Sequence, residues 1–184
     1  LFADAIQALL AFQALPVSAQ LPRYDEALLR RELQLFPEWY VQRHLGCTFS
    51  PAQQQLWERS CQLLVDAALA QPTVVVHRDY MPRNLMISEP NPGVLDFQDA
   101  VIGPVTYDIT SLFKDAFLSW PEQRVQGWLQ GYWDAALAAG IPVQGSFAEF
   151  HRASDLMGLQ RHLKVIGIFA RICHRDGKPR YLAD

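Results

Sequence analysis

Helical patterning on both sides of one short β-branched segment is the feature that most constrains this fold. Before that segment, apolar residues recur at helical spacing over three stretches, 2–13, 24–45 and 51 to about 70. Pro37 should break or restart the second stretch, and Gly46 should stop it. The third stretch opens with a capping-box pattern, Ser50-Pro51-Ala52-Gln53. The first 70 residues are therefore predicted to be helical.

The pattern then changes to short strands. The run TVVV at 73–76 is too short for a helix and rich in β-branched residues, which favours a strand. Two further apolar runs, 85–87 and 94–95, flank the turn sequence Glu-Pro-Asn-Pro-Gly and predict a hairpin. We therefore expect three short strands within an insert at about 73–100.

Helical patterns return after Gly103-Pro104. A second capping-box pattern, Ser119-Trp120-Pro121-Glu122, predicts a helix ending at Gly140, and a third, Ser146-Phe147-Ala148-Glu149, predicts one reaching about Cys173 with a possible interruption at Gly158. The predicted fold class is mainly α with a small β insert.

Charge and cysteine content exclude several classes of protein. The 16 basic and 19 acidic residues give a net charge of −3, which offers no strong field to attract nucleic acid or an anionic membrane. No apolar run approaches the roughly 20 residues that span a bilayer. Cys47, Cys61 and Cys173 are odd in number and widely spaced, which argues against a disulfide framework and fits a reducing cytoplasm.

The insert contains nearly all the residues that suggest chemistry. His77, Asp79 and Asn84 form the pattern His-x-Asp-x-x-x-x-Asn directly after the first predicted strand, and Asp96 follows the hairpin. In phosphoryl transfer, such an Asp accepts the proton of the attacking hydroxyl, while the Asn and the later Asp hold magnesium on the nucleotide phosphates. Hard oxygen ligands of this kind are what magnesium prefers.

Each of these residues also has a plainer interpretation. His77 is a histidine that hydrogen-bonds the backbone in many cores, and even in a kinase it orders the loop rather than reacting. Asp79 and Asn84 are common turn residues, and Asp96 could be an exposed loop charge. Asp108 could cap a helix, but we favour a role in bracing the catalytic loop.

A second His-Arg-Asp triplet serves as an internal control. At His174 to Asp176 the same three residues recur, but the residue five positions beyond Asp176 is Tyr181 rather than Asn, and no β-branched strand precedes them. We interpret this copy as the end of a helix, with Gly177 as the stop.

These motifs together resemble the aminoglycoside phosphotransferase and choline kinase superfamily, which has a protein-kinase-like fold. The segments HRDYMPRNLM, LDFQDAVIGPVTYDITSL and QRHLKVIGIFARICHRDGKPRYL are similar to the anomeric kinases of N-acetylmuramate and N-acetylglucosamine in peptidoglycan recycling. The resemblance covers most of the chain, as the C-terminal lobe of such an enzyme. It implies ATP and Mg²⁺, phosphorylation of the C1 hydroxyl of an amino sugar, Asp79 as catalytic base, and Asn84 and Asp96 as magnesium ligands.

The sequence departs from this family pattern at its N-terminal side. It contains no Gly-x-Gly-x-x-Gly, and its only lysines, Lys114, Lys164 and Lys178, lie on no predicted strand. The chain opens on Leu1 and a helical pattern, so we expect it to begin within a longer protein. An N-terminal lobe in cis would cover the nucleotide, and the chain by itself is expected to be inactive or nearly so.

The acceptor remains open at the level of sequence. N-acetylmuramate carries a carboxylate, for which Arg83, Arg161 and Lys164 are candidates, although we favour the plainer interpretation of the last two as solvated helix charges. An aminoglycoside or choline-type kinase, a metal-dependent phosphohydrolase built on His77, Asp79 and Asp96, and a non-catalytic sugar-binding helical module are the alternatives.

Overall fold

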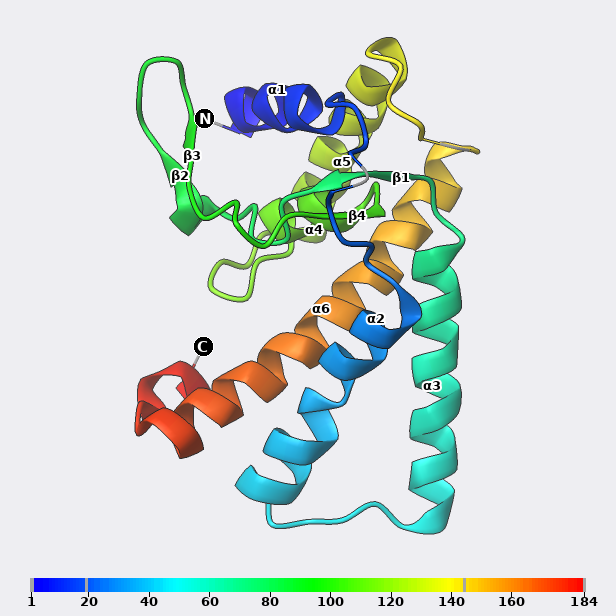
Figure 1. Ribbon diagram of the computed structural model, residues 1–184, viewed down its shortest axis with the longest axis vertical. Helices are drawn as coiled ribbons and strands as arrows, with labels where there is room; N and C mark the ends of the chain where they lie inside the picture. Colours follow the sequence, from blue (N-terminus) through cyan, green and yellow to red (C-terminus); the bar gives the residue numbers. More distant parts are fainter. Residues whose placement is uncertain (1, 19, 144, 184) are drawn as a thin grey trace.

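The computed structural model describes residues 2–18, 20–143 and 145–183 (Figure 1). Helices dominate it, as predicted. The elements in chain order are α1 (Phe2–Gln13), α2 (Glu26–Leu33), the π-helix η1 (Phe36–His44), α3 (Pro51–Leu69), β1 (Thr73–Val76), the 3₁₀-helix η2 (Pro82–Asn84), β2 (Leu85–Met86), β3 (Gly93–Val94), β4 (Val101–Pro104), α4 (Tyr107–Phe113), α5 (Glu122–Ala138), α6 (Phe147–Asp176) and the 3₁₀-helix η3 (Pro179–Ala183).

Two small antiparallel pairs of strands make up the β structure. β2 and β3 form the predicted hairpin, with Leu85 opposite Val94. β1 pairs with β4, a strand that the sequence did not predict, so that Val76 lies opposite Val101. Val101 and Ile102 are too short an apolar run to predict a strand, and the Gly103-Pro104 sequence that follows them is typical of a turn. Proline is nevertheless allowed at a strand end, where no ladder donor is needed.

α6 is the longest element and crosses the molecule diagonally, with η1, α3 and α4 packed against it (Figure 1). Its close approach to the chain between α2 and η1 requires a glycine. A Cβ on Gly167 would lie 2.4 Å from the carbonyl carbon of Leu35. The expected interruption at Gly158 is wrong, because α6 continues through it to Asp176. An isolated glycine is tolerated in a helix that is packed on both sides.

Two of the three predicted capping boxes are present. Ser50 with Gln53 begins α3 and Ser146 with Glu149 begins α6, each with both reciprocal hydrogen bonds. The predicted box at Ser119 is wrong. The N-cap of α5 is Pro121, so Ser119 precedes it by two residues and no side chain caps the helix. α6 ends at Gly177 in the left-handed conformation, as the sequence predicted.

Aromatic side chains join α1 to the helices that follow the insert. Phe2 packs against Phe113 of α4 and Trp128 of α5, with ring centroids 5.5 and 4.8 Å apart. Four of the five tryptophans pack against the buried core: Trp57, Trp120, Trp128 and Trp133. All three cysteines are free thiols. Within the described ranges, no helix has the length and apolar character needed to cross a membrane.

The contact at Gly167 leads to a prediction about stability. Gly167→Ala should lower the free energy of unfolding by about 1–3 kcal/mol, because the added methyl group must displace the backbone at Leu35. Gly131→Ala in α5 is the matched control, since a Cβ there meets nothing within 4 Å. The control should raise stability by about 0.5–1 kcal/mol through helix propensity. Urea unfolding of both variants measures the difference, and a Gly167→Ala variant as stable as the control would contradict this account of the packing.

Candidate active site

The loop between β1 and β2, residues 77–84, is held at its start by a buried carboxylate. The Asp108 side chain, in the first turn of α4, accepts hydrogen bonds from the backbone N–H groups of His77 at 2.7 Å and Arg78 at 3.0 Å. Burial raises the pKa of Asp108 to about 7, although these two donors act to lower it. Asp108 does not cap α4, whose N-cap is Thr106. Its contacts are with the loop.

Arg78 adopts a backbone conformation that is uncommon for a residue with a side chain. Its φ is 75°, in the left-handed region. Asp108 holds its N–H group, Arg161 Nη1 donates to its carbonyl at 3.1 Å, and its own Nη2 donates to Glu32 at 2.6 Å. Three separate contacts therefore fix one strained residue immediately before Asp79.

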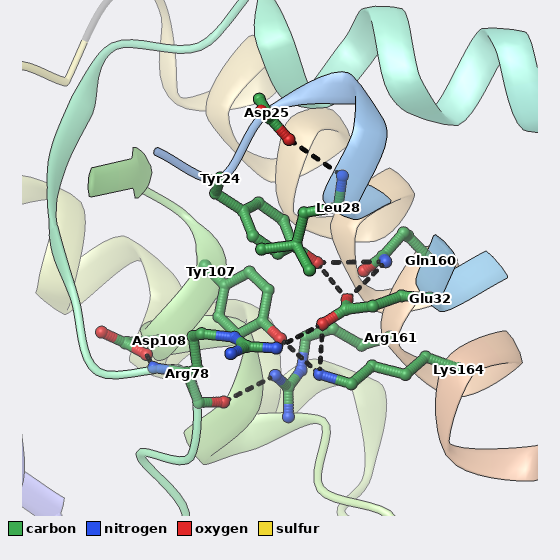
Figure 2. A network of polar contacts seen from close by, with 10 residues as sticks. All are labelled: Tyr24, Asp25, Leu28, Glu32, Arg78, Tyr107, Asp108, Gln160, Arg161 and Lys164. Carbon is green, nitrogen blue, oxygen red and sulfur yellow. Dashed lines mark hydrogen bonds and ion pairs between the residues drawn. The ribbon is translucent and has the colours of Figure 1, made fainter. Parts of the chain in front are cut away.

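Glu32 of α2 lies at the centre of a buried polar network (Figure 2). Its side chain is 6% exposed and pairs with Arg78 and with Lys164, whose Nζ lies 2.9 Å from Oε1. Tyr24 and Gln160 donate to its other oxygen. Burial acts to raise the pKa of Glu32, but Lys164, Tyr24 and Arg78 outweigh it and lower the pKa to about 2.

His77 is fully buried at the start of the loop, with its ring between Phe12 and Tyr80. Burial lowers its pKa, and the nearby carboxylates of Asp79 and Asp96 only partly oppose this. Its ring nitrogens make no hydrogen bond of regular geometry within the described part of the chain. A neutral imidazole in this position fills space beneath the loop.

Asp79 and Asn84 lie at the two ends of one short turn. Asp79 is half-buried, and its carbonyl accepts hydrogen bonds from the Asn84 side-chain amide at 2.9 Å and from the backbone N–H of Met81 at 3.0 Å. The N–H of Leu95 donates to the Asn84 carbonyl at 3.0 Å, which brings the residue before Asp96 next to Asn84. Asp96 itself is exposed and has a φ of 71°.

These side chains suit a magnesium ion by their chemistry. The Asn84 amide nitrogen is used on the Asp79 carbonyl, so its amide oxygen is the atom left for a cation. The Asp96 carboxylate is exposed and accepts a hydrogen bond from Gln98. One amide oxygen and one carboxylate from neighbouring segments are a typical protein contribution to a magnesium site.

The described residues do include one group of three potential metal ligands, but it lies away from Asn84 and Asp96 in the sequence. Glu122, His151 and Asp155 come together where α5 begins beside α6. His151 presents one ring nitrogen to each carboxylate, and Lys114 forms an ion pair with Asp155. This cluster includes none of His77, Asp79 and Asp96. The ligand set that a two-metal phosphohydrolase needs is therefore not assembled around these loop residues.

A pocket of about 190 Å³ opens beside Asp79. Its polar lining consists of Asp79, Lys114, Asp115, Arg161, His162 and Lys164, and the rest is apolar, including Phe117 and Phe169. The guanidinium of Arg83, an exposed residue, lies 3.3 Å from the centre of the Phe117 ring. A cavity with apolar walls and a few polar groups around one carboxylate has the character of a small-molecule site.

Arg161 of α6 is buried and the Lys164 side chain is only 12% exposed, so the interpretation of the two as solvated charges is wrong. Arg161 is 7% exposed and donates to Ser111 at 2.6 Å as well as to the Arg78 carbonyl. Lys164 contacts the Tyr107 hydroxyl at 3.2 Å in addition to Glu32. Both line the pocket while they serve the network behind the loop.

Sequence reasoning missed Glu32 and Asp115. Glu32 could have been found, because it lies on the same helical face as Leu29 and Leu33, where an acidic residue interrupts an apolar stripe. Asp115 gives no such signal, because it lies in the irregular segment after α4 and only the fold brings it to the pocket.

Comparison with known proteins agrees with the fold. The model of the APH phosphotransferase enzyme family matches residues 1–150, so the chain belongs to this family. The resemblance that the motifs indicated is thereby confirmed, and the architecture is that of the C-terminal lobe of a protein-kinase-like fold.

Three relatives carry the same name, N-acetylmuramate/N-acetylglucosamine kinase. Those of Pseudomonas putida and Pseudomonas aeruginosa are 76% and 68% identical over the whole chain, and that of Neisseria meningitidis is 49% identical over 98% of it. The chain spans about half the length of these relatives, 54% in each case.

The network around Glu32 should make stability depend on pH. Glu32→Gln leaves two largely buried cations, Arg78 and Lys164, facing a neutral amide and should cost about 3–5 kcal/mol at neutral pH. The pKa of Glu32 is depressed in the folded state, so its contribution is full above its ordinary pKa of about 4.3 and is lost as the pH falls towards 2. The gap between wild type and variant should therefore narrow below about pH 4.3 in denaturant titrations.

Glu26→Gln is the matched control on the same helix. Glu26 pairs with Arg30 on the exposed side of α2, where each side chain is about half exposed. Its removal should cost less than about 0.5 kcal/mol. Equal losses for the two variants, or a gap that stays constant with pH, would show that Glu32 does not act as a buried anion.

Proposed function

We propose that this chain is the substrate-binding and catalytic part of an ATP-dependent sugar kinase that phosphorylates the anomeric hydroxyl of N-acetylmuramate or N-acetylglucosamine. The observation that carries the proposal is the position of Asp79. This residue follows a strained, triply held Arg78 and lines a pocket large enough for a small molecule. Family membership and the names of the relatives support the reaction class and the acceptor.

In the proposed mechanism, Asp79 accepts the proton of the acceptor hydroxyl as that oxygen attacks the γ-phosphorus of ATP and the bond from the γ-phosphorus to ADP breaks. The hydrogen bonds to its carbonyl and the anchoring of Arg78 hold the backbone of Asp79 in place before substrate arrives, and we expect most of the rate to come from positioning. Asn84 and Asp96 would hold Mg²⁺, which neutralises charge on the nucleotide phosphates when bound. An anomeric hydroxyl is comparatively acidic and needs only a weak base.

The charges of the pocket favour a sugar over a polycation. Lys164 is paired with Glu32, Lys114 with Asp155, and Arg161 lies close enough to Asp79, Asp108 and Asp115 to interact with all three. An aminoglycoside would need several uncompensated carboxylates. For an acceptor with a carboxylate, Arg83 is the most accessible of the three candidate bases, since Arg161 and Lys164 are already engaged.

The relatives are longer than this chain, and the part of them that it does not match is relevant to nucleotide binding. We propose that a further lobe in the same polypeptide covers the ATP phosphates and supplies the glycine-rich loop and lysine that this chain lacks. The 184-residue chain by itself should then show little or no turnover. Free thiols and an ATP-dependent reaction fit the reducing environment of a cytoplasm.

Replacement of Asp79 tests the proposed mechanism. In the full-length protein, Asp79→Ala should lower kcat by about 10²–10⁴ with a smaller effect on the KM values, because it removes proton transfer and not substrate binding. Steady-state kinetics with coupled detection of ADP measure this. A variant that retains nearly normal kcat would remove Asp79 from the chemistry.

The acceptor is tested by incubating the full-length protein with ATP, Mg²⁺ and, separately, N-acetylmuramate, N-acetylglucosamine, choline or kanamycin. Mass spectrometry should show a phosphorylated amino sugar, sensitive to a phosphatase that cleaves sugar 1-phosphates. Modification of only choline or kanamycin would overturn the assignment of the acceptor. Phosphate release from a sugar phosphate without nucleotide would indicate a hydrolase, and sugar binding without any product a binding module.

A further inference from the structure

Asp115 is the one acidic residue lining the pocket that the proposed mechanism does not use. It lies in the irregular segment directly after α4, and its side chain is only partly exposed. Its Oδ2 atom is buried and has no hydrogen-bond partner within the described part of the chain. Burial raises its pKa, while the backbone N–H groups of Ala116 and Phe117 and the charge of Arg161 act to lower it.

The neighbouring cations do not satisfy this oxygen. Lys114 pairs with Asp155, and Arg161 donates to Ser111 and to the Arg78 carbonyl. The charge of Arg83 also acts to lower the pKa of Asp115, but its guanidinium lies over the Phe117 ring. A buried acceptor that lacks a partner is unfavourable, and in native proteins such groups are few and usually have a functional reason. Since Asp115 lines the same cavity as Asp79, a bound molecule is the natural source of the missing donor.

The other walls of the cavity restrict what that molecule can be. Phe117 and Phe169 contribute aromatic rings whose centroids lie 5.5 Å apart. A carboxylate that accepts hydrogen bonds beside an apolar aromatic surface suits a sugar ring, which has hydroxyl donors around its rim and apolar C–H groups on its faces.

We propose that Asp115 binds a ring hydroxyl of the acceptor sugar, one other than the hydroxyl that is phosphorylated, and thereby sets the specificity of the enzyme. This inference rests on the proposed function, because it assumes that the pocket holds the acceptor. A charge-assisted hydrogen bond from a ring hydroxyl to Asp115 orients the sugar so that its reactive hydroxyl faces Asp79.

The test measures kinetics of Asp115→Asn in the full-length protein. The KM for the amino sugar should rise about 10–100-fold, because the carboxylate is replaced by a weaker, neutral acceptor. The KM for ATP should stay within about twofold, and kcat should change much less than in Asp79→Ala. Asp66→Asn is the matched control, since Asp66 is exposed on α3 and accepts only from Gln62 in its own helix.

Substrate analogues give a second measurement that does not depend on the folding of a variant. For the wild-type enzyme, one of the N-acetylglucosamine analogues lacking the 3-, 4- or 6-hydroxyl should lose at least about 10-fold in kcat/KM. Asp115→Asn should lose far less on the same deoxygenation, because the bond is already weakened.

The outcomes separate the inference from the function on which it rests. A wild-type protein that phosphorylates no amino sugar refutes the proposed function. An active wild type in which no single deoxygenation matters, or an Asp115→Asn variant with an unchanged KM for sugar, overturns the role of Asp115 alone. A variant that loses kcat at constant KM also overturns it, since Asp115 would then act in the chemical step.

Discussion

The buried carboxylate of Glu32 is the interaction on which the active-site geometry depends. A charge in the interior is costly unless it is paired and hydrogen-bonded, and Glu32 receives a cation from the loop, a cation from α6 and two neutral donors. If any of these partners moved away, Glu32 would be left as a buried charge with fewer compensating contacts. The network therefore fixes the relative positions of α2, the loop and α6, which are far apart in the sequence (Figure 2).

The loop stores strain that this network compensates. Arg78 has a positive φ and is held by two carboxylates, Asp108 at its backbone N–H and Glu32 at its side chain. Without these contacts, relaxation of Arg78 to an ordinary conformation would change the orientation of the following residue, Asp79, which lines the pocket. Arg161 adds a link from the Arg78 carbonyl to Ser111 of α4, so the loop, α4 and α6 act as one support.

Local patterns in the sequence were sufficient for most of the secondary structure. Two capping boxes, the stop at Gly177 and the hairpin all followed from short-range chemistry, because the residues that make these bonds are neighbours. β4 was missed because its partner, β1, lies some 25 residues earlier, and only that pairing makes Val101–Pro104 a strand. The motif residues were recognised by spacing, but the supporting contacts of Glu32, Lys164 and Asp115 depend on long-range packing that no local pattern encodes.

Under the proposed function, the charge arrangement explains how one pocket can present several ionic groups to an acceptor that is neutral or carries a single negative charge. Most of the cations that line the pocket have protein partners, Lys164 with Glu32 and Lys114 with Asp155. The pocket therefore does not attract anions in general through unpaired positive charge. Partnered cations are also held rigidly, and a rigid wall discriminates by shape and hydrogen bonding more than by net charge. Under the proposed function, discrimination among sugars then falls to groups that have bonding capacity left. Among the described residues that line this cavity, that group is the Asp115 carboxylate, whose Oδ2 atom has no hydrogen-bond donor.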